Sequence, residues 1–198
     1  MAKLLIIVLV QLLLYINLYC HTSGVTEKNK IPGESLSIKN HPKAKSVNMT
    51  IKVPSRWKIR EGNRPNVVKV FTGDSSIYLI MIKENATFFS RNEARELLKD
   101  DDLVNNIIQE SILNASNFTV IDKSIVTIGT YPSIFYKAKV TTERTGLTIT
   151  LIMNSWTIFY EDKLVLLQSS YLENNNASLI DDLFFKITNS VIFPDQYN

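Results

Sequence analysis

The alternation of apolar and polar residues predicts three consecutive strands in the C-terminal half of the chain. They cover Tyr131–Thr142, Leu147–Tyr160 and Leu164–Leu172, where β-branched and aromatic residues predominate. Short polar joins separate them, since Glu143–Gly146 supplies a glycine for a positive-φ turn position and Glu161–Lys163 is a compact charged turn. The pattern therefore predicts an antiparallel meander around which the other elements pack.

Further strands are predicted upstream of this meander. Asn48–Val53 alternates apolar and polar residues, and Val67–Thr72 with Ile77–Lys83 form a hairpin. Tyr78–Ile82 is apolar at consecutive positions, which is typical of a strand covered on both faces. Phe118–Ile128 is the strand that leads into the meander.

Three helices are predicted between and after these strands. Ser90 caps the first, Arg91–Leu98, and Glu93 completes a capping box. The second, Leu103–Leu113, follows a run of aspartates, and the last, Ala177–Val191, carries an apolar stripe at helical spacing. This order of elements predicts an α+β fold, in which a single antiparallel β-sheet is flanked by helices on both faces as an αβα sandwich.

Residues 1–20 are predicted to be a signal peptide or a membrane anchor. Lys3 precedes the nearly unbroken apolar run Leu4–Ile16, which is short for a membrane-spanning helix of about 20 residues. Cys20 lies where a bacterial lipoprotein carries its lipidated cysteine, although the three residues before it do not match that motif. Lipidation at Cys20, ordinary cleavage nearby and retention as an anchor stay open, and each predicts an exported protein that is periplasmic, envelope-associated or secreted.

The remainder of the chain divides into three parts. Residues 21–46 are polar, lysine-rich and without apolar periodicity, which predicts a flexible linker. Residues 47–193 form one predicted domain, and residues 194–198 a C-terminal tail.

Composition argues against several classes of function. The formal net charge of +3 is mild and mixed along the chain, so no nucleic-acid partner is predicted. Cys20, His21 and His41 are the only cysteine and histidines, and all precede the predicted domain. Without them the domain lacks the residues for Cys-His or Ser-His-Asp catalysis and for a zinc site, so no catalytic residue, metal or cofactor is predicted.

Basic side chains are densest after the first strand of the predicted domain. Arg56, Lys58 and Arg60 alternate, so they share a face where the chain is extended, and Arg64 follows in a polar loop. With Trp57 beside them, they are candidate residues for binding a protein partner. The alternative interpretation is a solvated loop with Trp57 in the core.

Two segments of the predicted domain also resemble a known family. Ile51-Lys52-Val53-Pro54-Ser55-Arg56-Trp57 matches a strand-Pro-x-x-Trp entry, and Ile187–Phe193 matches the closing I-x-x-S-hydrophobic-x-F. With the helix after the second hairpin, Val47–Phe193 resembles the PsbP-like family, which includes a photosystem subunit, a eukaryotic Ran-binding protein and bacterial secreted or lipid-anchored proteins. The resemblance implies a PsbP-like fold and a non-catalytic binding or assembly role.

Three hypotheses on function follow. The first is a secreted or envelope-tethered protein-binding or assembly module that is not an enzyme. The second is a carrier of a small ligand or metal ion, with a pocket between sheet and helix lined by carboxylates and tyrosines. The third, least favoured, is a carboxylate-dependent hydrolase.

Overall fold

The computed structural model describes residues 33–73, 75–84, 90–112, 117–144, 147–173 and 177–197. The signal peptide or anchor predicted at 1–20, including Cys20, lies outside the described residues, as does the turn predicted at Gly146. Among the residues that are described, no helix is long and apolar enough to cross a membrane.

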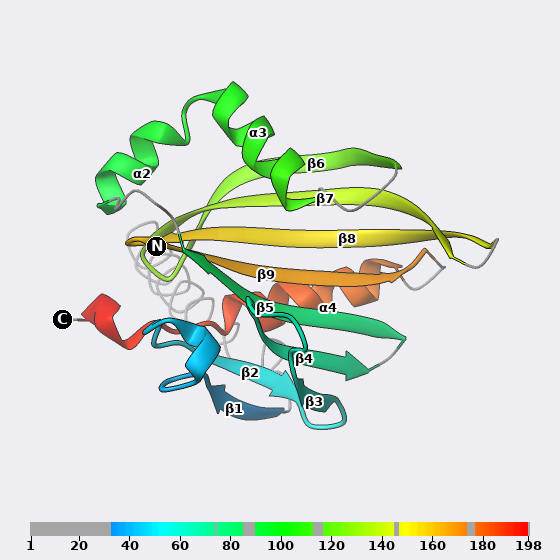
Figure 1. Ribbon diagram of the computed structural model, residues 1–198, viewed down its shortest axis with the longest axis horizontal. Helices are drawn as coiled ribbons and strands as arrows, with labels where there is room; N and C mark the ends of the chain where they lie inside the picture. The colour runs from blue at the N-terminus through cyan, green and yellow to red at the C-terminus, as the bar shows by residue number, and fades with distance from the viewer. Residues whose placement is uncertain are drawn as a thin grey trace, which may run out of the picture. The chain divides into compact units, whose positions relative to one another are not determined.

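Seven strands of the described chain form one sheet, in which every neighbouring pair is antiparallel (Figure 1). Their order is β3-β4-β5-β9-β8-β7-β6, and β1 and β2 pair as a separate two-stranded sheet. The strands are β1 (Gly33–Ser37), β2 (Thr50–Pro54), β3 (Lys58–Glu61), β4 (Val67–Gly73), β5 (Ser76–Glu84), β6 (Asn117–Ile128), β7 (Tyr131–Arg144), β8 (Leu147–Tyr160) and β9 (Lys163–Leu172). The helices are η1 (Pro42–Ala44), α2 (Arg91–Leu97), α3 (Asp101–Ser111), α4 (Ala177–Asn189) and η2 (Pro194–Tyr197).

The predicted meander is confirmed as β7, β8 and β9. Its registers place Tyr136 opposite Ser155, and Ser155 opposite Gln168. Glu161 adopts a positive φ of 53° in the turn that joins β8 to β9. The α+β class and the antiparallel pairing are therefore confirmed, whereas the expectation of a single sheet was wrong because β1 and β2 pair outside the large sheet.

The caps of the first two helices explain where they begin. Ser90 accepts a hydrogen bond from the Glu93 N–H, and the Glu93 carboxylate accepts one from the Ser90 N–H, which completes the predicted capping box. The Asp100 carboxylate accepts bonds from the amides of Asp102 and Leu103, so the aspartate run caps α3.

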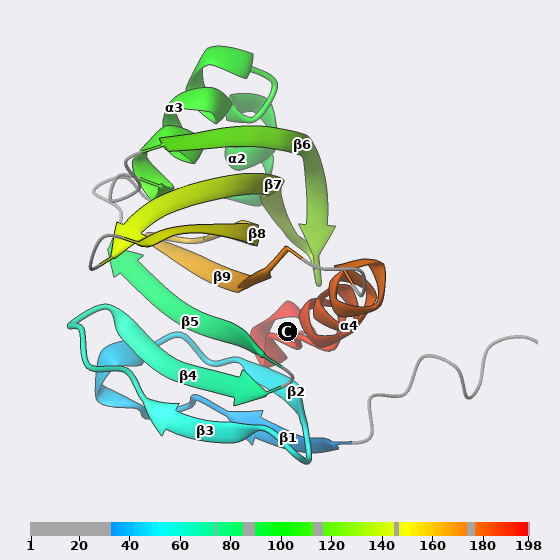
Figure 2. The same cartoon turned by 90° about the vertical axis from the view of Figure 1, so that its right-hand side faces the viewer.

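Successive residues of β7 contact different helices, α2 and α3 or α4, which Figure 2 shows at separate places around the large sheet. Ile134, Tyr136 and Ala138 form a buried cluster with apolar residues of α2 and α3. Phe135 points the other way, with its ring centroid 5.1 Å from that of Phe185 on α4. Since side chains alternate along a strand, the sheet has two buried faces at this point, which is why Ile134, Phe135 and Tyr136 are apolar or aromatic at consecutive positions.

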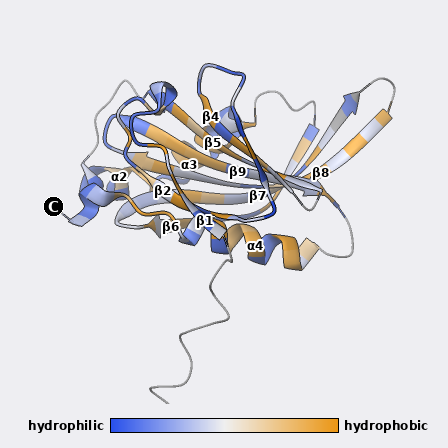
Figure 3. Cartoon of the chain, turned by 90° about the horizontal axis from the view of Figure 1, so that it is seen from below, coloured by the Kyte–Doolittle hydropathy of each residue, from blue (hydrophilic) through white to orange (hydrophobic). Residues whose placement is uncertain are grey.

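Helix α4 packs through one stripe of its surface, and Figure 3 shows both apolar and polar segments along it. Phe184 and Ile187 are buried in the larger core cluster, whereas Leu179 is 70% exposed. The same cluster contains Ile51 and Val53 of β2, so the small sheet contributes to this core.

The prediction of a flexible linker at 21–46 was wrong for the second half of that segment. Gly33–Ser37 is β1, paired in register with β2, and Ile38 is buried in the core. His41 caps η1 through its ring Nδ1, which accepts a hydrogen bond from the Lys43 N–H. The folded region therefore begins before Val47. The error arose because β1 is too short and polar to show periodicity, and pairing with β2 supplies its stability.

The C-terminal tail predicted at 194–198 was also wrong. Pro194–Tyr197 is η2, and the Tyr131 hydroxyl donates a hydrogen bond to the Asp195 carboxylate. The Arg91 guanidinium donates to the same hydroxyl at 3.1 Å and lies over the Tyr131 ring. Burial and the neighbouring Asp195 raise the pKa of Tyr131 to about 12, so this hydroxyl stays protonated and joins η2 to β7.

Candidate functional site

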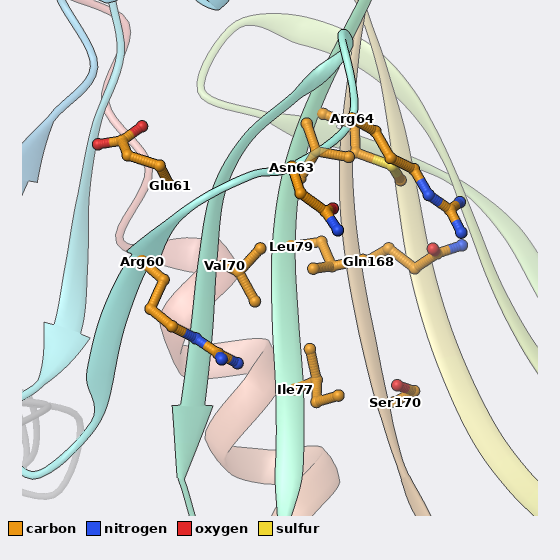
Figure 4. Close-up of a pocket in the computed structure, with 11 residues that line it drawn as sticks. Arg60, Glu61, Asn63, Arg64, Val70, Ile77, Leu79, Gln168 and Ser170 are labelled. Carbon is orange, nitrogen blue, oxygen red and sulfur yellow. The ribbon is translucent and has the colours of Figure 1, made fainter.

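A groove of about 450 Å³ lies on the large sheet where β4, β5 and β9 are not covered by helix (Figure 4). Registers place Val70 opposite Leu79 and Leu79 opposite Gln168, on the face that α2 and α3 cover further along. The groove's volume falls within the roughly 300–1,000 Å³ of protein ligand sites. The residues that line it are Arg60, Glu61, Asn63, Arg64, Val67, Val70, Ile77, Leu79, Met81, Gln168 and Ser170.

The floor of the groove is apolar. Val70, Leu79 and Met81 are half-buried, and Ile77 is 41% exposed. Ile77, Leu79 and Met81 alternate along β5 with the fully buried Tyr78, Ile80 and Ile82, so the apolar run in this strand serves two faces. One face completes the core, and the other presents apolar surface at the bottom of an open groove.

Two arginines line the groove from β3 and from the loop that follows it. Arg60, on β3, is opposite Val70, which places both side chains on the groove face, and Arg64 follows in the loop before β4. Figure 4 shows both guanidiniums directed into the groove, together with the side-chain amides of Asn63 and Gln168. Within the described part of the chain, no carboxylate forms an ion pair with Arg60 or Arg64. The groove therefore has unbalanced positive charge.

Glu61 lines the groove but its carboxylate points away from it, as Figure 4 shows. The carboxylate is bonded to Lys69 on β4 and lies 2.6 Å from the His41 ring Nε2. Hydrogen bonds from Lys69 and then His41 lower the pKa of Glu61 from 4.5 to about 2. This carboxylate is therefore occupied elsewhere and does not neutralise the arginines.

The lowered pKa of Glu61 predicts a pH-dependent contribution to stability. A carboxyl group with a depressed pKa in the folded state stabilises fully above its unfolded pKa, near 4.5, and loses that contribution as pH falls through about 2. We expect the difference in unfolding free energy between the wild type and Glu61→Gln to shrink from pH 5 to pH 2, a window set by these two pKa values. Urea unfolding at each pH measures it.

The control for this prediction is Glu110→Gln, which removes an exposed carboxylate on α3. The difference in unfolding free energy between the wild type and Glu110→Gln should vary less over the same pH window. A wild-type advantage over Glu61→Gln that is constant with pH would contradict the proposed role of the Glu61 carboxylate.

The loop that carries Arg64 is held in place by the segment that the sequence predicted to be a linker. The Lys43 ammonium donates hydrogen bonds to the carbonyls of Gly62 and Arg64, the latter at 3.0 Å. The Arg64 carbonyl also accepts the Val67 N–H at 3.2 Å. A Cβ at position 62 would lie 2.1 Å from the Val67 carbonyl oxygen, so only glycine fits there. These contacts fix the position of the Arg64 backbone.

The structure brings together part of the predicted basic group. Arg60 and Arg64 line the groove, whereas Arg56 lies in the exposed turn between β2 and β3. Lys58 lies two residues before Arg60 on β3, opposite Thr72, so the two side chains share a face of the sheet. Lys58 is nevertheless not among the residues that line the groove. Trp57 is buried and packs edge-on against Phe184, as the alternative interpretation predicted.

The apolar floor and the polar wall of the groove were not predicted from the sequence. Leu79 and Met81 were predicted to be covered because Tyr78–Ile82 is apolar throughout, yet both are only half-buried. Gln168 and Ser170, on β9, follow the apolar run Leu164–Leu167 of that strand. Their alternation with buried neighbours was the available signal, since it marks a face that is not fully covered.

A second polar cluster joins α4 to the sheet, and it also escaped the sequence analysis. The Asp181 carboxylate accepts hydrogen bonds from the Lys137 ammonium at 2.5 Å, the Asn154 side-chain amide at 2.7 Å and the Tyr171 hydroxyl at 2.8 Å. Burial, followed by the bond to Asp181, raises the pKa of Tyr171. Because these groups bind one another, the cluster anchors α4 and offers little to a ligand.

The second and third hypotheses required carboxylates around a pocket. The groove lies on an open part of the sheet and not between sheet and helix, and its lining contains no tyrosine and one carboxylate, which is directed away. Among the described residues, no group of three or more histidine, cysteine, aspartate or glutamate side chains could hold a metal ion.

Comparison with known proteins finds likeness in structure alone. No protein-family model matches the sequence, and no curated protein matches it. The solution structure of cyanobacterial PsbP (CyanoP) from Synechocystis sp. PCC 6803 has a TM-score of 0.54 at 12% identity, over 86% of this chain and 98% of that one. The Ran-binding protein Mog1p of Saccharomyces cerevisiae also has a TM-score of 0.54, at 8% identity, over 83% of this chain and 96% of that one.

A structure from Bacteroides thetaiotaomicron VPI-5482 is similar as well. Its TM-score is 0.50 at 13% identity, over 84% of this chain and 50% of that one, so this chain spans about half of that protein. Together these likenesses confirm the PsbP-like fold that the sequence resemblance implied. At such low identity they establish the fold and not the function.

Proposed function

We propose that this protein is a non-enzymatic binding or assembly module whose partner is another protein. The observation that carries the proposal is the groove on β4, β5 and β9, where Arg60 and Arg64 face an apolar floor without a carboxylate partner among the described residues. Arginine beside exposed apolar surface is a common composition of protein interfaces. One protein of similar structure, Mog1p, is named for its binding to Ran, and a protein partner for this chain is in keeping with that likeness.

The place of action is part of the same proposal. The apolar segment at 1–20 supports export, with the folded region acting in the periplasm, at the envelope or after secretion. The state of Cys20 then decides between a lipid tether and a soluble form. Intact-mass analysis of the protein from its native cell distinguishes lipidation, a free thiol and removal by cleavage.

Cross-linking from inside the groove tests the proposal. A photoreactive amino acid replaces Asn63, whose side chain points into the groove, and cross-linked proteins are identified from the native cell. We expect a defined partner whose yield falls about tenfold or more when Arg60 and Arg64 are both changed to alanine, as for interface residues that carry most of the binding energy. Arg56→Ala and Lys58→Ala should have smaller effects because neither residue lines the groove.

Arg95→Ala is the matched control, because Arg95 is an exposed arginine on α2, outside the groove. Its cross-linking yield should equal that of the wild type, and thermal unfolding should show that all variants are folded. Equal yields from the wild type and the double arginine variant would overturn the assignment of the groove as the contact surface.

A small-ligand carrier is the second candidate, and the volume of the groove is the observation that favours it. Its open position on the sheet face argues against it, because carriers enclose most of the ligand's surface. Native mass spectrometry of the full chain would identify a retained small molecule.

A further inference from the structure

The chemistry of the groove also restricts which part of a partner it fits, and this inference rests on the proposed function. We propose that the groove binds an extended peptide segment of the partner, in which an acidic side chain and an apolar side chain stand two positions apart. Each part of this motif follows from one feature of the groove.

The acidic residue follows from the charge balance. Arg60 and Arg64 direct two guanidiniums into the groove, and the single carboxylate among the lining residues belongs to Glu61. That carboxylate is directed away and is bonded to Lys69 and His41. An incoming carboxylate would therefore find a guanidinium, at Arg60 or at Arg64, whose planar donors match its two oxygens. A basic segment would be repelled, and a neutral one would leave this charge uncompensated.

The apolar residue and its spacing follow from the register of the strands. Residues that lie opposite one another on neighbouring strands form a row, or rung, across the sheet. One rung consists of Arg60, Val70, Leu79 and Gln168. The next consists of Lys58, Thr72, Ile77 and Ser170. These rungs are two residues apart along β5. In an extended peptide, side chains two positions apart share a face and have the same separation. A peptide that runs along β5 with its acidic side chain over the rung of Arg60 and Leu79 thus places the side chain two positions away over Ile77, which is 41% exposed.

A peptide suits the walls of the groove better than a lipid does. The side-chain amides of Asn63 and Gln168 both point into it, and each offers two N–H donors and one acceptor. A peptide backbone presents matching C=O and N–H groups, whereas an acyl chain would cover the Asn63 amide without pairing it.

Selection from a displayed library of random peptides tests the motif. The bait is the full chain, and the peptides have roughly ten residues, a length of about 33 Å when extended. We expect the selected sequences to share Asp or Glu with Leu, Ile, Val or Phe two positions before or after it. The affinity of a selected peptide should fall about tenfold or more when its acidic residue becomes the amide, or when Arg60 and Arg64 become alanine.

Two control variants test whether peptide binding depends on the charge of Arg60 and Arg64. Arg95→Ala should bind the selected peptide as the wild type does. The double variant Arg60→Glu/Arg64→Glu should lose the selected peptide and gain affinity for a version in which Lys replaces the acidic residue. A purely structural role of the arginines would not produce this exchange.

Three results would overturn the inference. The selected peptides could lack an acidic residue, or they could bind the double alanine variant as tightly as the wild type. Vesicles of phosphatidylcholine and phosphatidylserine could bind through Arg60 and Arg64 while no peptide does, which would identify the ligand as a lipid headgroup. These results are separate from the cross-linking experiment, because a protein partner captured from Asn63 would stand whatever motif the library yields.

Discussion

Replacing Phe184 with alanine is expected to lower the free energy of unfolding by about 3–5 kcal/mol, the usual cost of truncating a buried phenylalanine. Phe184 on α4 is fully buried, and its ring lies 5.9–6.1 Å, between centroids, from those of Trp57, Tyr78 and Tyr171. The truncation would leave a cavity among three large rings that cannot collapse into it. Such a loss is a large fraction of the roughly 5–15 kcal/mol that stabilises a typical domain.

Urea unfolding followed by tryptophan fluorescence measures this effect. Leu179→Ala, on the same helix but at a position 70% exposed, should change stability by no more than about 0.5 kcal/mol. Phe184→Leu should fall between the two and keeps the comparison usable if the alanine variant does not fold. A Phe184→Ala variant as stable as Leu179→Ala would contradict the packing of α4 described above.

Replacing Asp181 with alanine is expected to cost about 2–4 kcal/mol, because it leaves polar partners without an acceptor in a poorly solvated site. Asn154 is fully buried, and Tyr171 nearly so, and both donate hydrogen bonds to this carboxylate. The Lys137 ammonium, 2.5 Å from the Asp181 carboxylate, would lose its ion-pair partner. Urea unfolding again gives the measurement.

The neighbouring aspartate is the matched control for Asp181. Asp182 pairs with Lys186 one turn along α4, and its side chain is 60% exposed, so Asp182→Ala should cost no more than about 0.5 kcal/mol. Changing Lys137 to methionine in the Asp181→Ala background should recover part of the loss, since it removes the uncompensated charge. If both aspartate variants lose the same stability, the cluster contributes nothing to anchoring α4.

Local sequence features determined most of the elements in the described part of the chain. The strands of the meander are long, rich in β-branched and aromatic residues and separated by short polar joins, so their bounds agree closely with β7, β8 and β9. Ser90 and Asp100 satisfy free amides within one turn of themselves, which is why the starts of α2 and α3 could be predicted. The resemblance to the PsbP-like family rested on such local motifs and agrees with the fold found.

The sequence also identified basic residues at the groove, but it could not define the groove itself. Arg60 and Arg64 were candidates because charged residues cluster there in the chain. Whether two arginines face the same space depends on the pairing of β3 with β4 and on the contacts of the loop with Lys43. Pairing between strands links residues far apart in the sequence, and no local pattern encodes it.

The sequence alone therefore determined the features that depend on neighbours in the chain. These are the period of a strand, the cap of a helix and the residue types that a site contains. Only the tertiary structure decided that β1 belongs to the fold, that Asp181 meets Lys137, Asn154 and Tyr171, and that Ile77 and Leu79 form an open floor. The physical reason is that stability and exposure at these positions come from contacts across the sheet. Those contacts form only when strands and helices distant in the chain pack together.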